Sequence, residues 1–139
     1  MSHRKPILLV EDGHSEGPTV RQALELLGVG DRVVQSTTAA QALEHLTSDG
    51  ARRPSVIVAD ASTQDADGLE LLKRVKADEQ LKTIPVIIVA PSSDVRTIDE
   101  SFGLGVAGYV VKSPKLDEFV EAVRAVHEYW LLSESPVGR

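Results

Sequence analysis

Three stretches of the chain are continuous apolar runs, which lack the polar alternation of a half-buried strand. They cover residues 6–10, 55–60 and 84–90. Such runs are typical of strands that a parallel sheet buries on both faces. Two shorter strands are predicted over residues 32–36 and 107–111. The run at 55–60 ends in a carboxylate, Asp60, which we expect at the lip of the sheet rather than in the core.

Between these strands, apolar residues recur at the spacing of amphipathic helices. The five predicted helices begin near residues 18, 38, 67, 92 and 116. Their start and stop signals are Pro18 in a first turn, the capping-box pairs Thr38–Gln41 and Asp67–Glu70, capping by Ser92 and Ser93, and Gly103 and Gly105 as breakers. Tyr129 and Trp130 are neighbours on the last helix, so one of them is expected on an exposed patch that supports a homodimer.

Strand and helix alternate five times, which predicts an α/β fold with a parallel sheet and helices on both faces. Because right-handed crossovers bring the carboxyl ends of parallel strands to one edge, four chain positions are expected to meet there. These positions are Glu11–Asp12, Asp60, Ala90 and Lys112. We expect one domain over residues 1–139, with an ordered core of about 5–132 and a frayed tail at 133–139.

Composition excludes several classes of function. The chain has 139 residues, 42% hydrophobic and 4% aromatic, with a formal net charge of −6 and no cysteine. The acidic balance and the few aromatic residues argue against a nucleic-acid partner. Without cysteine there are neither disulfides nor thiolate metal sites. No signal peptide or membrane-spanning run is recognisable, so the expectation is a soluble cytoplasmic protein.

The expected edge of the sheet gathers three carboxylates and one ammonium. Like charges repel there by roughly 4 kcal/mol per pair at the effective dielectric of a protein surface, so a cation is needed. Oxygen-only ligands favour Mg²⁺. A carboxylate beside Mg²⁺ and a lysine can act as a nucleophile toward a phosphoryl group. The plain alternative is that these acidic residues at strand ends are only solvated.

Several motifs resemble the receiver domain of two-component response regulators over nearly the whole chain. They are Ile7–Asp12, Val56–Asp60 with Asp67–Gly68, Ile84–Val89 and Gly108–Lys112. The resemblance implies a three-layer, flavodoxin-like (βα)5 fold with strand order 2-1-3-4-5. The segment Glu128–Leu132 is similar to single-domain regulators that partner bacterial phytochromes.

The resemblance also implies residue roles. Asp60 is the phosphoacceptor, charged by a sensor histidine kinase, which a bacteriophytochrome would supply in the narrower match. Glu11, Asp12, Asp60 and the backbone carbonyl of Ser62 hold Mg²⁺. Lys112 contacts the phosphoryl group, and Tyr109 is the aromatic switch. The signal leaves through the face that the fourth helix, fifth strand and fifth helix share.

Two positions depart from the family pattern. Ala90 stands where the family has a Thr or Ser hydroxyl that bonds the phosphoryl oxygen and draws the switch aromatic inward. The hypothesis is therefore that phosphorylation of Asp60 is weakly coupled to Tyr109. Ser113 stands where the family has a cis proline after the lysine, so a trans Lys112–Ser113 bond is expected. Alternatively, Ser113 and Pro114 simply begin the last helix.

Two rival functions stay open. One is a degenerate receiver that acts as a protein-interaction module with weak or no phosphate control, as Ala90 and Ser113 indicate. The other is a small Mg²⁺-dependent phosphatase-like enzyme with Asp60 as the nucleophile. Ser62, two residues after Asp60, counts against this enzyme because it supplies no second acid or base.

Overall fold

A computed structural model describes residues 5–13, 17–61, 67–91 and 94–134, with side chains described up to residue 128. Five parallel strands form one sheet in the order β2-β1-β3-β4-β5, as predicted. The strands are β1 (Ile7–Val10), β2 (Val33–Ser36), β3 (Val56–Asp60), β4 (Val86–Ala90) and β5 (Gly108–Val111). The three central strands are buried at every position, which confirms the prediction drawn from their apolar runs.

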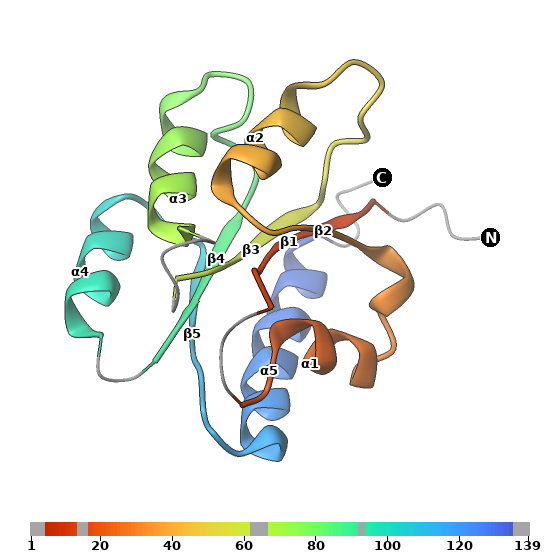
Figure 1. The fold of residues 1–139 in the computed structure, drawn as a ribbon, viewed down its shortest axis with the longest axis vertical. Coiled ribbons are helices and arrows are strands. Elements are labelled where there is room, and N and C mark those ends of the chain that lie inside the picture. Colours follow the sequence, from red (N-terminus) through yellow and green to blue (C-terminus); the bar gives the residue numbers. More distant parts are fainter. Residues whose placement is uncertain (1–4, 14–16, 62–66, 92–93, 135–139) are drawn as a thin grey trace.

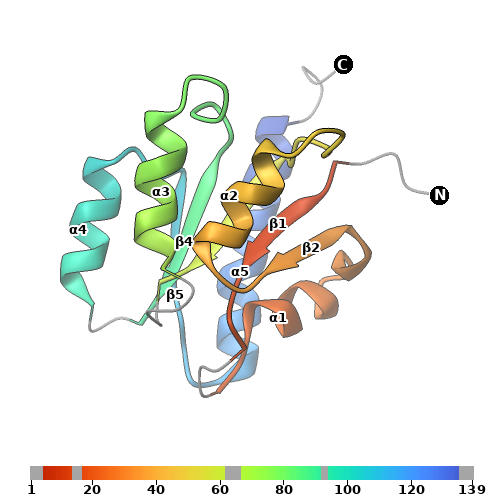
Figure 2. The same ribbon diagram turned by 45° about the horizontal axis from the view of Figure 1, so that its top comes forward.

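Five α-helices and one 3₁₀ turn connect the strands. They are α1 (Val20–Leu26), η1 (Gly30–Arg32), α2 (Ala39–Thr47), α3 (Gly68–Ala77), α4 (Val95–Gly103) and α5 (Leu116–Glu134). Helices α1 and α5 cover one face of the sheet, while α2 and α3 cover the other, with α4 beside α3 (Figure 1, Figure 2). The result is the predicted three-layer arrangement.

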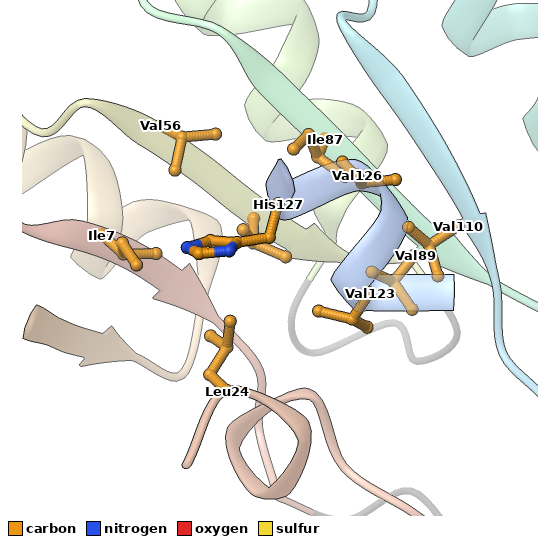
Figure 3. Close-up of a pocket in the computed structure, with 10 residues that line it drawn as sticks. Ile7, Leu24, Val56, Ile87, Val89, Val110, Val123, Val126 and His127 are labelled. Carbon is orange, nitrogen blue, oxygen red and sulfur yellow. The ribbon is translucent and has the colours of Figure 1, made fainter. Parts of the chain in front are cut away.

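The sheet separates two apolar cores. One lies under α1 and α5 and includes Phe119, which is fully buried. The other lies under α2 and α3 and includes Leu71 and Leu72. A cavity of about 30 Å³ remains in the first core, between the strands and α5. Figure 3 shows His127 of α5 extending toward the strands from this side.

The capping of three helices differs from the prediction. Pro18 does not open the first turn of α1, because Thr19 is the N-cap and forms a capping box with Gln22. Asp67 adopts the left-handed conformation, with φ 51°, and makes no side-chain cap bond. The usual N-cap residue has an extended backbone, from which its side chain reaches the helix amides. The backbone of Asp67 is not extended, and the predicted Asp67–Glu70 capping box does not form. The cap of α4 is Asp94, which accepts from the Thr97 amide at 3.1 Å.

The remaining helix predictions have different outcomes. Thr38 caps α2 by accepting from the Gln41 amide at 3.1 Å, as predicted. Ser92 and Ser93, predicted as caps, lie outside the described residues, and so do the side chains of Tyr129 and Trp130. Helix α5 continues to Glu134, two residues beyond the predicted end of the ordered core.

Candidate functional site

Asp60 ends β3 at the centre of the sheet, between β1 and β4. Asp60 is completely buried, so the expectation that it lies at the lip of the sheet rather than in the core is wrong. Gly68 packs on its backbone and the Lys112 side chain lies beside its carboxylate. The β4 partner of Asp60 in the register is Val89, and the next amide, that of Ala61, donates to the Val89 carbonyl at 2.7 Å. Regular pairing therefore continues past the carboxylate, which fixes where Asp60 lies.

Lys112 follows β5 directly and supplies the cation next to Asp60. Its amide donates to the Ala90 carbonyl at 2.9 Å, so β5 stays paired with β4 up to this residue. Its ammonium Nζ lies 3.6 Å from Asp60 Oδ2, and the two side chains are only 8% and 0% exposed. The prediction that the ends of β3 and β5 meet at one edge of the sheet is therefore confirmed. Removing one partner of an ion pair that is buried in this way leaves the other partner's charge without that compensation, which is costly inside a protein.

Glu11 follows β1 at the same edge and is only 1% exposed. Its Oε2 accepts from the Val20 amide at 2.7 Å, and its Oε1 accepts from the Arg21 amide at 3.3 Å. Burial raises the pKa of the Glu11 carboxyl above its usual value, and these two amide bonds oppose that rise. The charge of Asp60 raises this pKa further and that of Lys112 lowers it, so Glu11 shares the electrostatic field of the other two groups.

The donor chemistry of this edge suits a hard divalent cation. Three carboxylates, those of Glu11, half-buried Asp12 and Asp60, and one ammonium, that of Lys112, follow strand ends at this edge, so negative charge is in excess. Oxygen donors of this kind fit Mg²⁺. Within the described ranges, however, no group of three or more acidic, histidine or cysteine side chains is arranged to hold a metal ion. Ser62, whose carbonyl was predicted as a ligand, lies outside those ranges.

Ala90 and Tyr109 lie on the side of the sheet that α2 and α3 cover, away from α5. Ala90 ends β4 and is fully buried. Tyr109 of β5 packs its ring against the core under α2 and α3. Its hydroxyl is buried and accepts or donates no hydrogen bond among the residues that the structure describes. Burial raises the pKa of Tyr109 above its usual value of 10.0, and the charge of Asp94 raises it further.

Of the two sequence-based readings of the connection after Lys112, the structure confirms the trans peptide bond and contradicts the helix start at Ser113 and Pro114. No described peptide bond is cis, so Lys112–Ser113 is trans as expected. Helix α5 begins only at Leu116, so Ser113 and Pro114 are not its N-cap and first residue. Instead the Ser113 hydroxyl donates to Glu118 at 2.8 Å and accepts from the Lys115 amide at 3.1 Å. This turn holds Lys112 at the sheet edge without a cis bond.

Sequence reasoning missed two features of the site. The carboxylate of Glu11 points to α1, and Gly68 packs on the backbone of Asp60, where an added Cβ would lie 2.9 Å from the Asp60 carbonyl oxygen. The Asp67–Gly68 pair was a visible signal for the second feature. Nothing in the sequence signals the first, because the bonded groups are nine residues apart.

Comparison with known proteins assigns the family. The sequence matches the response regulator receiver domain over residues 7–124, which is most of its length. The chain belongs to the response regulator receiver domain family. Receiver domains are phosphoacceptor signalling modules rather than conventional enzymes. Within the described ranges, none of this receiver domain's helices combines the length and apolarity needed to cross a bilayer.

Two response regulators of cyanobacterial type resemble this receiver domain over most of their length, and one of them is a phytochrome response regulator. The solved structure of the phosphorylated cyanobacterial phytochrome response regulator RcpA superimposes with a TM-score of 0.79 at 31% identity, covering 92% of this chain and 94% of that one. The response regulator Rcp1 from Synechocystis is 28% identical, over 91% of this chain and 89% of its own. A Mn²⁺-bound structure of Rcp1 superimposes with a TM-score of 0.77, covering 91% of this chain and 94% of that one.

Another relative of similar identity has a different role. The probable methanogenesis regulatory protein FilR2 from Methanothrix harundinacea is 28% identical, over 90% of this chain and 83% of its own. Both kinds of relative are thus about equally similar to this receiver domain in sequence.

Proposed function

We propose that this receiver domain accepts a phosphoryl group on Asp60 from the phosphohistidine of a sensor histidine kinase, with Mg²⁺ as cofactor. The observation that carries the proposal is the 3.6 Å approach of Lys112 Nζ to Asp60 Oδ2 at the carboxyl edge of the sheet. A carboxylate oxygen of Asp60 attacks phosphorus, the bond from phosphorus to the histidine nitrogen breaks, and an aspartyl phosphate forms. Lys112 stabilises the charge on the transferred oxygens.

The acidic residues of this edge complete the proposed site. Asp12, Asp60 and the carbonyl of Ser62 would supply oxygen ligands to the metal ion. Glu11 would be the third acidic residue of the metal site. Bound Mg²⁺ would neutralise charge on the phosphoryl oxygens. The solved Mn²⁺-bound form of Rcp1 supports a divalent cation as a cofactor, since Rcp1 resembles this chain over most of both lengths.

The proposed output surface is the face shared by α4, β5 and α5. Three large apolar side chains are exposed on α4 and β5: Val95, Phe102 and Val111 are 61%, 60% and 42% exposed. Exposed apolar groups of this size support a protein partner. A homodimer through the last helix belongs to the same proposal, with Tyr129 and Trp130 as its aromatic candidates. The similarity to the phytochrome response regulator RcpA and to the bacteriophytochrome response regulator RtBRR supports a bacteriophytochrome as the kinase, which would place the chain in the cytoplasm.

A second candidate is a receiver that binds partners without phosphate control. The buried Ala90 favours it, because no hydroxyl at this position can bond a phosphoryl oxygen. In this case Asp60 and Lys112 would stabilise the fold without taking part in transfer.

Labelling with acetyl phosphate and Mg²⁺ separates the candidates. A stable label on the wild type that Asp60→Asn abolishes supports the phosphoacceptor. A folded wild type that takes no label supports the interaction module. Steady turnover of varied phosphate esters would instead support the phosphatase-like enzyme.

A further inference from the structure

Glu11 is bound to α1 through both of its carboxylate oxygens. Oε2 accepts from the Val20 amide at 2.7 Å, and Oε1 accepts from the Arg21 amide at 3.3 Å. Val20 is completely buried, so water cannot replace the carboxylate at its amide. Hydrogen bonds from amides to an ionised carboxylate are among the stronger ones in proteins.

These two bonds complete the capping of α1. The N-cap Thr19 accepts from the Gln22 amide at 3.1 Å, and the Gln22 side chain accepts from the Thr19 amide at 2.9 Å. The Ala23 amide already donates to the Thr19 carbonyl. The capping box of Thr19 and Gln22 leaves two amides at the start of α1 without an acceptor within the helix, those of Val20 and Arg21. Glu11 accepts from both.

Glu11 is itself held in place from β2. The Gln35 side chain donates to the Glu11 carbonyl at 3.1 Å, and Arg21 Nη1 donates to Gln35 Oε1 at 3.4 Å. The Glu11 amide donates to the Ser36 carbonyl at 3.0 Å. Glu11, Arg21 and Gln35 therefore form a closed ring of hydrogen bonds that joins the end of β1, the start of α1 and β2.

We propose that Glu11 is a positioning residue, which fixes α1 and the backbone that leads into Asp12 and contributes to a metal site through its charge alone. Direct ligation would require its oxygens to leave α1, and the Val20 amide would then be buried without an acceptor. The lack of a three-residue metal-ligating cluster among the described side chains agrees with this orientation. The metal part of this inference rests on the proposed function, whereas the helix-fixing part does not.

The test compares Glu11→Gln and Glu11→Ala with Asp12→Asn and with Glu25→Gln. The last is a matched control on α1, since Glu25 makes an exposed ion pair with Arg21. Amide exchange at Val20 and Arg21 is measured by NMR in EDTA, and Mn²⁺ affinity is measured separately by titration. In Glu11→Gln the amide nitrogen of the new side chain cannot accept, so at least one of the two bonds is lost.

Glu11→Ala should speed exchange at both Val20 and Arg21 by about tenfold or more, and Glu11→Gln should do so at one or both of them, as expected for losing a bond to a charged acceptor. Asp12→Asn and Glu25→Gln should change it by less than about twofold. Mn²⁺ affinity should fall further in Asp12→Asn than in Glu11→Gln.

Unchanged exchange in Glu11→Gln would overturn the proposal, and so would a loss of Mn²⁺ affinity equal to that of Asp12→Asn. If Glu11→Ala does not fold, Glu11→Gln alone decides. If the wild type binds no Mn²⁺, the proposed function loses its metal, and the exchange measurement still decides whether Glu11 fixes α1.

Discussion

Gly68 lies directly against the backbone of Asp60. A Cβ added at Gly68 would stand 2.9 Å from the Asp60 carbonyl oxygen and 3.1 Å from its carbonyl carbon. Backbone atoms cannot move aside as the end of a flexible side chain can. The start of α3 can therefore approach the phosphoacceptor candidate this closely only because residue 68 has no side chain.

Gly68→Ala should destabilise the protein by about 1–3 kcal/mol, the usual cost of overpacking, and should slow labelling by acetyl phosphate because β3 is displaced at Asp60. Denaturant unfolding measures the first effect. Gly103→Ala is the matched control, since nothing lies within 4 Å of its added Cβ. Equal stability of the two variants would contradict the close contact.

Lys112→Met should lower stability by about 3 kcal/mol in EDTA, because Asp60 and Glu11 lose the cation that compensates their buried charges. Lys115→Met provides the comparison. Lys115 makes a 3.9 Å ion pair with Glu118 at the surface, where it is 72% exposed, so its loss should cost under about 1 kcal/mol. Added Mg²⁺ should restore part of the stability of Lys112→Met and none of that of Lys115→Met. The same small loss in both variants would argue against a buried charge pair.

Ala90→Thr should strengthen the effect of phosphorylation on partner binding by about tenfold, within the usual range of allosteric coupling. A threonine hydroxyl at this buried position can bond a phosphoryl oxygen, which alanine cannot. Ala90→Val is the control, because valine has nearly the same shape and no hydroxyl. The hypothesis fails if Ala90→Thr behaves like the parent with and without phosphate, or if Ala90→Val has the same effect.

Tyr109→Phe should be at least as stable as the wild type at neutral pH, because the buried Tyr109 hydroxyl has no hydrogen-bond partner in the described part of the chain. Since the folded state raises the Tyr109 pKa, stability that is fully present below pH 10 is lost as the pH rises through the folded value. The variant should lose less stability than the wild type above pH 10. Thermal unfolding at a series of pH values measures this, and equal alkaline slopes would refute it.

The fold follows from sequence because its main signals are local. Continuous apolar runs such as 84–90 identify the central strands, and the parallel order then brings Asp60 and Lys112 to one edge. The start of α1 was misplaced because Pro18 and Thr19 both fit a first turn, and only the bonds with Gln22 decide between them.

The inner arrangement of the site was not predictable in the same way. The bonds of Glu11 to α1 span nine residues and depend on how the intervening loop closes. Asp67 carried a capping signal, but its backbone is left-handed, and the next residue, Gly68, packs closely on β3. These are tertiary constraints that local residue preference does not encode.

Helix α4 buries only Ser101 of its nine residues, while Val95 and Phe102 point outward. Substitutions on the outer side of this helix should therefore hardly affect folding, whereas those at the carboxyl edge of the sheet remain constrained by charge and packing. Under the proposed function, selection can change the partner that α4 recognises one surface residue at a time, while the phosphoryl-transfer site stays the same.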